Sequence, residues 1–209
     1  MGETMYDCFL SQFHCMKKVL DNRKKILGTA AEFFLSKMPD RVYLIGSGTS
    51  YNACNAAAYF MEQILKREIT VIAPSCVEKL YGKTPIAIVV SQGGRSTNTI
   101  DAIEKIHRQN IPVITLSDPA DTPVGKAGDF PALLAAEMEL VGPKTRGYAV
   151  TILSLYLLAL EVARYEKSIL EEDLKKYHDS FENTPSAPCG PWPGCVRSTW
   201  RRRPGGIRR

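Results

Sequence analysis

Five short apolar runs alternate with helical stretches, and this alternation constrains the fold of the chain more than any other feature. Each run is continuously apolar, which indicates a strand with both faces buried. Such strands alternating with helices predict βαβ units and a parallel sheet. We therefore expect an α/β fold: a three-layer, doubly wound, flavodoxin-like domain with a five-stranded parallel sheet and helices on both faces. The expected strands are 41–46, 69–73, 85–90, 111–117 and 130–136.

The remaining periodic segments predict helices. Residues 4–37 are expected to form two helical pieces that divide near Gly28. They are expected to pack outside the strand–helix unit and to cover either that unit or a partner subunit. The longest apolar stretch, residues 149–163, is shorter than the roughly 20 residues of a membrane span. A helix that is apolar on all sides at this length is typical of a buried core. The other expected helices are 50–67, 96–110, 145–167 and 168–182.

The formal net charge of +5 suggests a polyanionic partner until the charge is located along the chain. Residues 184–209 hold six Arg and no acidic residue, so the first 183 residues have one more acidic than basic residue. This tail has no helical or alternating period, and its composition differs abruptly from that of the body. We expect it to be disordered or aberrant, for example out-of-frame sequence. A nucleic-acid-binding arm is the least favoured interpretation, because aromatic residues do not interleave the arginines.

The cysteines of the body favour a cytoplasmic protein. Cys8, Cys15, Cys54 and Cys76 are widely spaced and form no Cys-x-x-Cys pair, which argues against a zinc ribbon or a redox site. We expect reduced, mostly buried thiols. The sequence shows no cluster of metal ligands, and we expect no metal, no cofactor, no nucleic acid and no membrane as partner.

Two loops at the expected carboxyl edge of the sheet, where open parallel sheets bind ligands, are unusual. The loop 46–51 is not a dinucleotide-binding turn, because Tyr51 stands where a third glycine is needed, and it lacks the Gly-Lys of a Walker loop. The loop 91–99 has two glycines, four hydroxyl residues and a helix start near Ser96, which suits a phosphate. Helix capping alone would explain one such loop. Two loops on one edge favour a phosphate-bearing polar ligand.

The sequence VYLIGSGTSYN, followed later by VVSQGGRSTNTI, resembles a sugar isomerase (SIS) domain. The resemblance covers residues 41–167 and is strongest to the first SIS domain of the glucosamine-6-phosphate synthase isomerase half and to related fructosamine-processing enzymes. It implies that the two loops hold a phosphorylated sugar. The residues that it assigns to sugar-phosphate binding are Gly48, Thr49, Ser50, Ser91, Gln92, Gly93, Ser96 and Lys144.

The chain departs from the family pattern at three of these positions or beside them. Gly93 stands where the family usually has serine, and Arg95 where it usually has an acid. Lys144 stands where the family often has serine, so it is expected either to touch the ligand or to be a solvated charge at a helix start.

The resemblance implies a domain of a sugar-phosphate isomerase or aminosugar-processing enzyme that binds a ketose or aminosugar 6-phosphate. Ketose–aldose interconversion needs a base beside the reacting carbons, and Glu139 is the one candidate on the expected edge. In the tandem relatives, catalytic residues lie in or after a second SIS domain. The chain is therefore expected to be a first half, and its catalytic competence stays open.

Two other functions stay open. The first is a non-catalytic sugar-phosphate sensor domain of a transcriptional regulator, although residues 1–40 show no clear turn between two DNA-binding helices. The second is a flavodoxin-like binder of nucleotide or flavin. A homodimer is also expected, because 4–37 and 149–163 offer more apolar surface than one sheet covers. The expected divisions are N-terminal helices 1–40, an SIS domain 41–167, a C-terminal helix 168–183 and the tail 184–209.

Overall fold

The computed structural model describes residues 3–142 and 144–183, so the expectation for the tail lies outside the described residues. Its sheet is parallel throughout, in the order β2-β1-β3-β4-β5. This is the strand order of a flavodoxin-like, doubly wound fold, and it confirms the expected fold class. The strands are β1 (Arg41–Gly46), β2 (Glu68–Ile72), β3 (Pro85–Val90), β4 (Val113–Ser117) and β5 (Phe130–Leu133).

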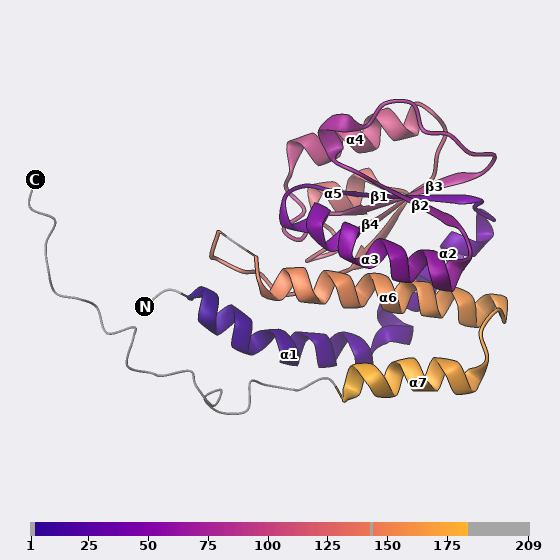
Figure 1. Cartoon of the computed structure of the whole chain (residues 1–209). Helices are drawn as coiled ribbons and strands as arrows, with labels where there is room; N and C mark the ends of the chain where they lie inside the picture. The colour runs from indigo at the N-terminus through magenta and orange to yellow at the C-terminus, as the bar shows by residue number, and fades with distance from the viewer. Residues whose placement is uncertain (1–2, 143, 184–209) are drawn as a thin grey trace, which may run out of the picture.

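Helices cover both faces of this sheet (Figure 1). One face carries α4 and α5, and the other carries α2 and α3, with α6 packed on their outer side. An additional outer layer of α1 and α7 packs against α6. The helices are α1 (Met5–Asp21), α2 (Arg23–Ser36), α3 (Thr49–Leu65), α4 (Thr97–His107), α5 (Pro123–Ala127), α6 (Arg146–Glu166) and α7 (Glu171–Glu182).

The apolar runs of the strands fill two cores, one on each face of the sheet. In β1, Val42 and Leu44 join the core under α2, α3 and α6, whereas Tyr43 and Ile45 join the core under α4. Successive side chains of a strand point to opposite faces. A strand with a core on each side therefore needs apolar residues at every position, which explains the continuous runs.

Helix α6 is the buried core helix that the apolar stretch 149–163 predicts. It is the one helix among the described residues that is long and apolar enough to cross a membrane, and 78% of its most apolar window is buried inside the protein. It lies between α2 and α3 on one side and α1 on the other (Figure 1). Neighbouring helices cover most of its apolar surface.

The division of the N-terminal helices falls at Asn22, not near Gly28 as the sequence suggested. The Asn22 side chain donates to Lys18 O at 2.9 Å, and the Arg23 guanidinium donates to Leu20 O at 2.7 Å, so side chains satisfy the carbonyl groups at the end of α1. Gly28 lies inside α2, where a Cβ atom would meet the Tyr165 hydroxyl at 3.4 Å. This is an ordinary contact distance, so Gly28 neither ends nor divides the helix.

Of the two coverings that the sequence left open for 4–37, α2 covers the sheet unit, because it packs on β5. One further expectation is corrected. Strand β5 ends at Leu133, three residues early, because the chain turns at Ala135, whose φ is 54°. The sequence also missed α5, a single turn whose N-cap Thr122 accepts from Gly125 N at 3.1 Å.

Candidate functional site

The two unusual loops leave the sheet side by side. Gly46, the last residue of β1, is the register partner of Val90, the last residue of β3. The loops that follow therefore start from neighbouring points on the carboxyl edge, and each leads into a helix, α3 or α4. The helix N-termini present free N–H groups and positive dipole ends at this edge, which suits an anionic ligand.

The first loop turns sharply at Gly48, whose φ of 55° favours glycine. Gly48 is the N-cap of α3, and no side chain caps this helix. Gly48 is exposed, and Thr49 and Ser50 are half-buried. The structure therefore places all three residues at the surface of the carboxyl edge. They lie at a helix N-terminus that no side chain caps.

The second loop is held in shape by β4 and α5. Ser91 N donates to Leu116 O at 3.0 Å, and Asp118 N donates to Gln92 O at 2.8 Å. Gly94 has a φ of 59°, and a Cβ atom there would lie 2.0 Å from Thr122 Oγ1. These contacts with β4 and with the segment that leads into α5 fix the backbone of the loop on one side.

The upper side of the second loop is open. Gly93 is exposed, and a Cβ atom there would meet nothing within 4 Å. Ser91 and Ser96 are half-buried, and Arg95 is exposed. Ser96 is the N-cap of α4 and accepts from Thr99 N at a long 3.4 Å. The loop thus brings Ser91, Gly93 and Ser96 to the same edge as Ser50.

Gln92 does not share this position. Its side chain is buried, and its Nε2 donates to Glu139 Oε2 at 3.0 Å and to Glu137 O at 3.3 Å. Gly147 leaves room for it, since a Cβ atom there would lie 2.0 Å from Gln92 Oε1. The Gln92 side chain therefore braces the loop against the start of α6, away from the open side.

Glu139, the candidate base, caps α6. Its carboxylate accepts hydrogen bonds from the backbone N–H groups of Thr145, Arg146 and Gly147 at 2.9–3.0 Å, and only 4% of the residue is exposed. Burial would raise the pKa of this carboxyl, but the hydrogen bonds from Gln92 and from these backbone groups outweigh burial and lower it. A buried carboxylate with a lowered pKa and filled acceptor positions is a poor proton acceptor. Its geometry supports a structural role.

Lys144 is neither a fully solvated charge nor a free cation. Its ammonium donates to Glu139 O at 2.6 Å and to Val141 O at 2.8 Å, and the residue is half-buried. Two of its three protons are thereby used. The lysine ties together the loop before α6, and one proton is left for a further acceptor.

The histidines lie away from the two loops. His107 Nε2 is 3.1 Å from Asp129 Oδ2 near the end of α4, and His178 Nδ1 accepts from Arg23 at 3.2 Å beside α2. His14 is exposed on α1. Among the described residues, no group of three or more His, Cys, Asp or Glu side chains could hold a metal ion.

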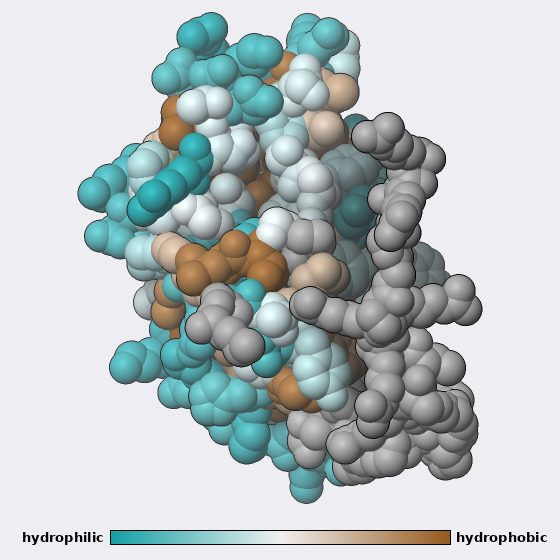
Figure 2. Space-filling model, turned by 90° about the vertical axis from the view of Figure 1, so that its left-hand side faces the viewer, coloured by the Kyte–Doolittle hydropathy of each residue, from teal (hydrophilic) through white to brown (hydrophobic). Residues whose placement is uncertain are grey.

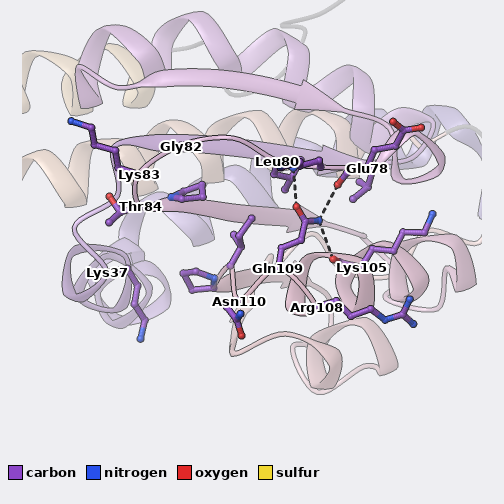
Figure 3. A pocket seen from close by; sticks show the side chains of 15 residues that line it. Lys37, Glu78, Leu80, Gly82, Lys83, Thr84, Lys105, Arg108, Gln109 and Asn110 are labelled. Carbon is purple, nitrogen blue, oxygen red and sulfur yellow. Dashed lines mark hydrogen bonds between the residues drawn. The ribbon is translucent and has the colours of Figure 1, made fainter.

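A hollow of about 920 Å³ lies near the opposite, amino edge of the sheet (Figure 3). It is lined by the segment before β3 and the end of α4. Its basic side chains do not converge: Lys37 and Lys83 point to one side, and Lys105 and Arg108 to the other. The Gln109 amide is occupied by Leu80 N, Glu78 O and Lys105 O. Ligands of such sheets bind at the carboxyl edge, so we place the site at the two loops.

Comparison with known families decides the classification of the fold. The model of the SIS domain family matches residues 35–161, which is more than half of the chain. The chain belongs to the SIS domain family. This match includes both loops of the carboxyl edge, and it confirms the resemblance that their motifs indicated.

Curated relatives of this SIS domain are glutamine–fructose-6-phosphate aminotransferases. The enzyme of Pyrobaculum aerophilum is 26% identical over 148 residues, which cover 68% of this chain and 25% of the enzyme. That of Streptococcus pyogenes serotype M6 is 27% identical over 140 residues, covering 65% of this chain and 23% of the enzyme. The chain thus spans about a quarter of the length of these relatives.

Solved structures show the same fold. The C-terminal domain of glucosamine-fructose-6-phosphate aminotransferase from Francisella tularensis superposes with a TM-score of 0.75 at 20% identity, over 86% of this chain and 52% of that chain. A protein proposed to be a phosphosugar isomerase, from Clostridium difficile 630, gives a TM-score of 0.79 at 22% identity, over 87% and 53%.

The sequence analysis did not identify the hydrogen-bonded cluster around Arg146, which holds the loop before α6. Buried Arg146 donates through its guanidinium to Ala136 O, Met138 O, the Ser11 hydroxyl and the Glu3 carboxylate at 2.7–3.1 Å. It fixes the loop before α6 to the first turns of α1. Arg146 directly follows Lys144 and Thr145, and this was the one feature of the sequence that pointed to it. The motif alone does not show that Arg146 is buried or which groups it binds.

Proposed function

We propose that this SIS domain binds a phosphorylated sugar, a ketose or aminosugar 6-phosphate, between the loops 46–51 and 91–96. The observation that carries the proposal is the paired origin of the loops at Gly46 and Val90, so that both loops and the helix starts that they lead to lie at the same edge of the sheet. A phosphate at this point would receive backbone N–H groups and serine hydroxyls, the donors that suit a dianion.

The residues that would contact the ligand differ in part from the motif. Ser50, Ser91 and Ser96 would supply hydroxyl groups, and the backbone of Gly48, Thr49 and Gly93 would line the anion. Gln92 would act by bracing the loop through Glu139. Lys144 would contribute charge at the rim through its remaining proton.

The names of the relatives support the class of ligand. They comprise aminotransferases that act on fructose 6-phosphate, and the structural neighbours include glucosamine-6-phosphate deaminase from Thermotoga maritima. We propose that the chain is a cytoplasmic domain of an isomerase or aminosugar-processing enzyme. The Glu139 carboxylate is engaged by Gln92 and by the start of α6, so an isomerisation would need a base other than Glu139.

Ligand-induced thermal stabilisation tests the proposal, since a ligand that binds only the folded state raises its stability. Fructose 6-phosphate or glucosamine 6-phosphate should raise the melting temperature, and unphosphorylated fructose should not. The double variant Ser91→Ala, Ser96→Ala should lose the shift. Ser36→Ala, at the end of α2, is the control and should keep it. Stabilisation by nucleotides alone would refute the proposal.

A further inference from the structure

The hollow at the amino edge of the sheet gathers positive charge. Five basic side chains line it, against one acidic side chain, Glu78. Residues 1–183 as a whole have one more acidic than basic residue, so this excess of positive charge is local. The hollow together with these side chains is called the basic groove, and its basic residues are Lys37, Lys79, Lys83, Lys105 and Arg108.

The charges of the basic groove are not neutralised within the part of the chain that the structure describes. There, neither the Lys83 nor the Lys105 ammonium has a hydrogen-bond or ion-pair partner. Arg108 pairs with Glu104 at 3.5 Å, but both side chains are largely exposed, and exposed pairs of this kind are weak. The other two lysines lie over aromatic rings, 4.6 and 5.5 Å from the ring centroids, which leaves their charge in place. The groove therefore offers unpaired positive charge to an anionic partner.

Helix ends explain part of this charge. Basic side chains near a helix C-terminus complement the helix dipole, and Lys105 and Arg108 lie at the end of α4, as Lys37 does at the end of α2. Lys79 and Lys83 lie outside any α-helix, in the segment between β2 and β3. They add positive charge to an edge that already has it. Like charges gathered in this way repel one another, and an anionic partner would relieve that repulsion.

The wall between β2 and β3 is preformed. The Gln109 amide accepts from Leu80 N at 2.8 Å and donates to Glu78 O at 2.9 Å, as Figure 3 shows. Farther along the same wall, the Asp40 carboxylate accepts from Lys83 N at 2.9 Å. A wall that is already ordered loses little conformational freedom when a partner binds. The basic groove is thus prepared for docking without rearrangement.

Apolar side chains form the floor of the basic groove. Val77, Leu80 and Ile111 line it, and they are 1%, 8% and 5% exposed. Figure 3 shows two pairs of basic side chains on opposite sides of this floor. A single small anion would engage only one of these pairs. An extended peptide suits the arrangement better, because successive residues can place acidic side chains on both sides and an apolar side chain on the floor.

The other end of the molecule has a different character. Figure 2 looks onto that end and shows apolar side chains gathered among hydrophilic ones. Met138 and Leu140, in the loop before α6, are 59% and 76% exposed. An acidic partner gains no charge pairing from apolar side chains. Charge complementarity therefore selects the basic groove for such a partner.

We propose that the basic groove docks an extended acidic segment of a partner protein, with acidic residues at both ends and an apolar residue between them. The acidic side chains pair with the two groups of basic residues, and the apolar side chain lies against the floor. Because the groove is at the amino edge, docking leaves the two loops of the carboxyl edge free. The proposal does not depend on which ligand those loops bind.

Fluorescence anisotropy of a labelled peptide tests the proposal with the full chain. The probe is the pentapeptide Glu-Glu-Leu-Glu-Glu. The wild-type chain should bind it, and binding should weaken as the salt concentration rises. The same peptide with glutamine in place of every glutamate should bind about tenfold more weakly or less, because the charge pairing is lost. With glycine in place of leucine it should bind about threefold to tenfold more weakly, because apolar burial is lost.

Paired charge reversals locate the binding surface. The double variant Lys83→Glu, Lys105→Glu should raise the Kd of the peptide about tenfold or more. The double variant Lys25→Glu, Lys126→Glu changes the net charge by the same amount at two exposed lysines outside the groove. This matched control should keep the Kd within about twofold, because salt screens charges that lie far from the peptide. The arginines of 184–209 are the same in both variants, so they cannot cause a difference between them.

Thermal unfolding checks that each variant is folded, and Lys83→Gln, Lys105→Gln replaces the first double variant if that variant is not. Absence of binding by the wild-type chain, or an equal effect of the two charge reversals, would overturn the proposal. Displacement of the labelled peptide by an oligothymidylate at a lower concentration than by the unlabelled peptide would overturn it too. The groove would then be a nucleic-acid surface.

Discussion

Gln92 Nε2 donates a hydrogen bond to Glu139 Oε2 at 3.0 Å, and this bond joins the loop after β3 to the loop before α6. The same carboxylate caps α6 through three backbone N–H groups. A helix N-terminus at the carboxyl edge thus already holds an anion supplied by the chain itself. By contrast, no side chain caps the N-terminus of α3 at this edge.

The first prediction concerns the charge of Glu139. Glu139→Gln should lower the free energy of unfolding at neutral pH by about 1–3 kcal/mol, because an uncharged amide replaces a buried, hydrogen-bonded carboxylate. The native pKa of Glu139 is lowered, so its stabilising effect is complete above the unfolded pKa of about 4.3 and is lost as the pH falls through the native pKa. The difference between wild type and variant should therefore shrink in acid.

Urea unfolding at several pH values measures this difference. Glu137→Gln is the control, because Glu137 is exposed and its ion pair with Lys18 is long, at 3.5 Å. Exposed pairs of this kind contribute about 0–1 kcal/mol. An effect of Glu139→Gln no larger than that of Glu137→Gln would show that the carboxylate does not support the start of α6.

A second prediction concerns the space around Gln92. Gly147→Ala should displace the Gln92 side chain, since the new Cβ would lie 2.0 Å from its Oε1, and should destabilise the protein by about 1–3 kcal/mol. Gly142→Ala in the same loop meets nothing within 4 Å and should be nearly neutral. Chemical denaturation of the two variants is the measurement. If the Gly147→Ala and Gly142→Ala variants were equally stable, the Gln92 side chain would be free to move aside.

The two neighbouring glycines of the second loop should respond differently to substitution. Gly93→Ser adds a hydroxyl where the surroundings are open and should tighten sugar-phosphate binding about threefold to tenfold. Gly94→Ser should disrupt the loop, because residue 94 has a positive φ and its Cβ would overlap Thr122. Calorimetric titration gives both affinities. Weaker binding by a folded Gly93→Ser variant would place the phosphate elsewhere.

Ser96 allows helix capping to be separated from ligand binding. Asn and Asp cap helices about as well as Ser, so Ser96→Asn and Ser96→Asp should both keep the melting temperature of the free protein. Only Ser96→Asp places a negative charge against the phosphate and should abolish binding of fructose 6-phosphate. If both variants bind the sugar phosphate equally well, Ser96 does not face the ligand.

The fold class, and the edge of the sheet at which the candidate residues lie, could be predicted from the sequence. Apolar runs such as 41–46 and 85–90 are set by burial on two faces, so strand positions and sheet class could be predicted. The division at Asn22 could not, because it depends on side-chain capping of α1. That the glycines and serines of the two loops lie at the carboxyl edge was predictable, because both loops directly follow strands. The positions of the Gln92, Glu139 and Lys144 side chains depend on contacts between loops distant in sequence, which a linear motif does not encode.

Isothermal titration calorimetry with fructose 6-phosphate tests the central claim most directly. The wild-type chain should bind fructose 6-phosphate and show no binding of fructose, since the phosphate is the group that the two loops hold. The Ser91→Ala, Ser96→Ala variant should bind neither. Absence of binding by the folded wild-type chain, or unchanged binding by the folded double variant, would contradict a sugar-phosphate site at the carboxyl ends of β1 and β3.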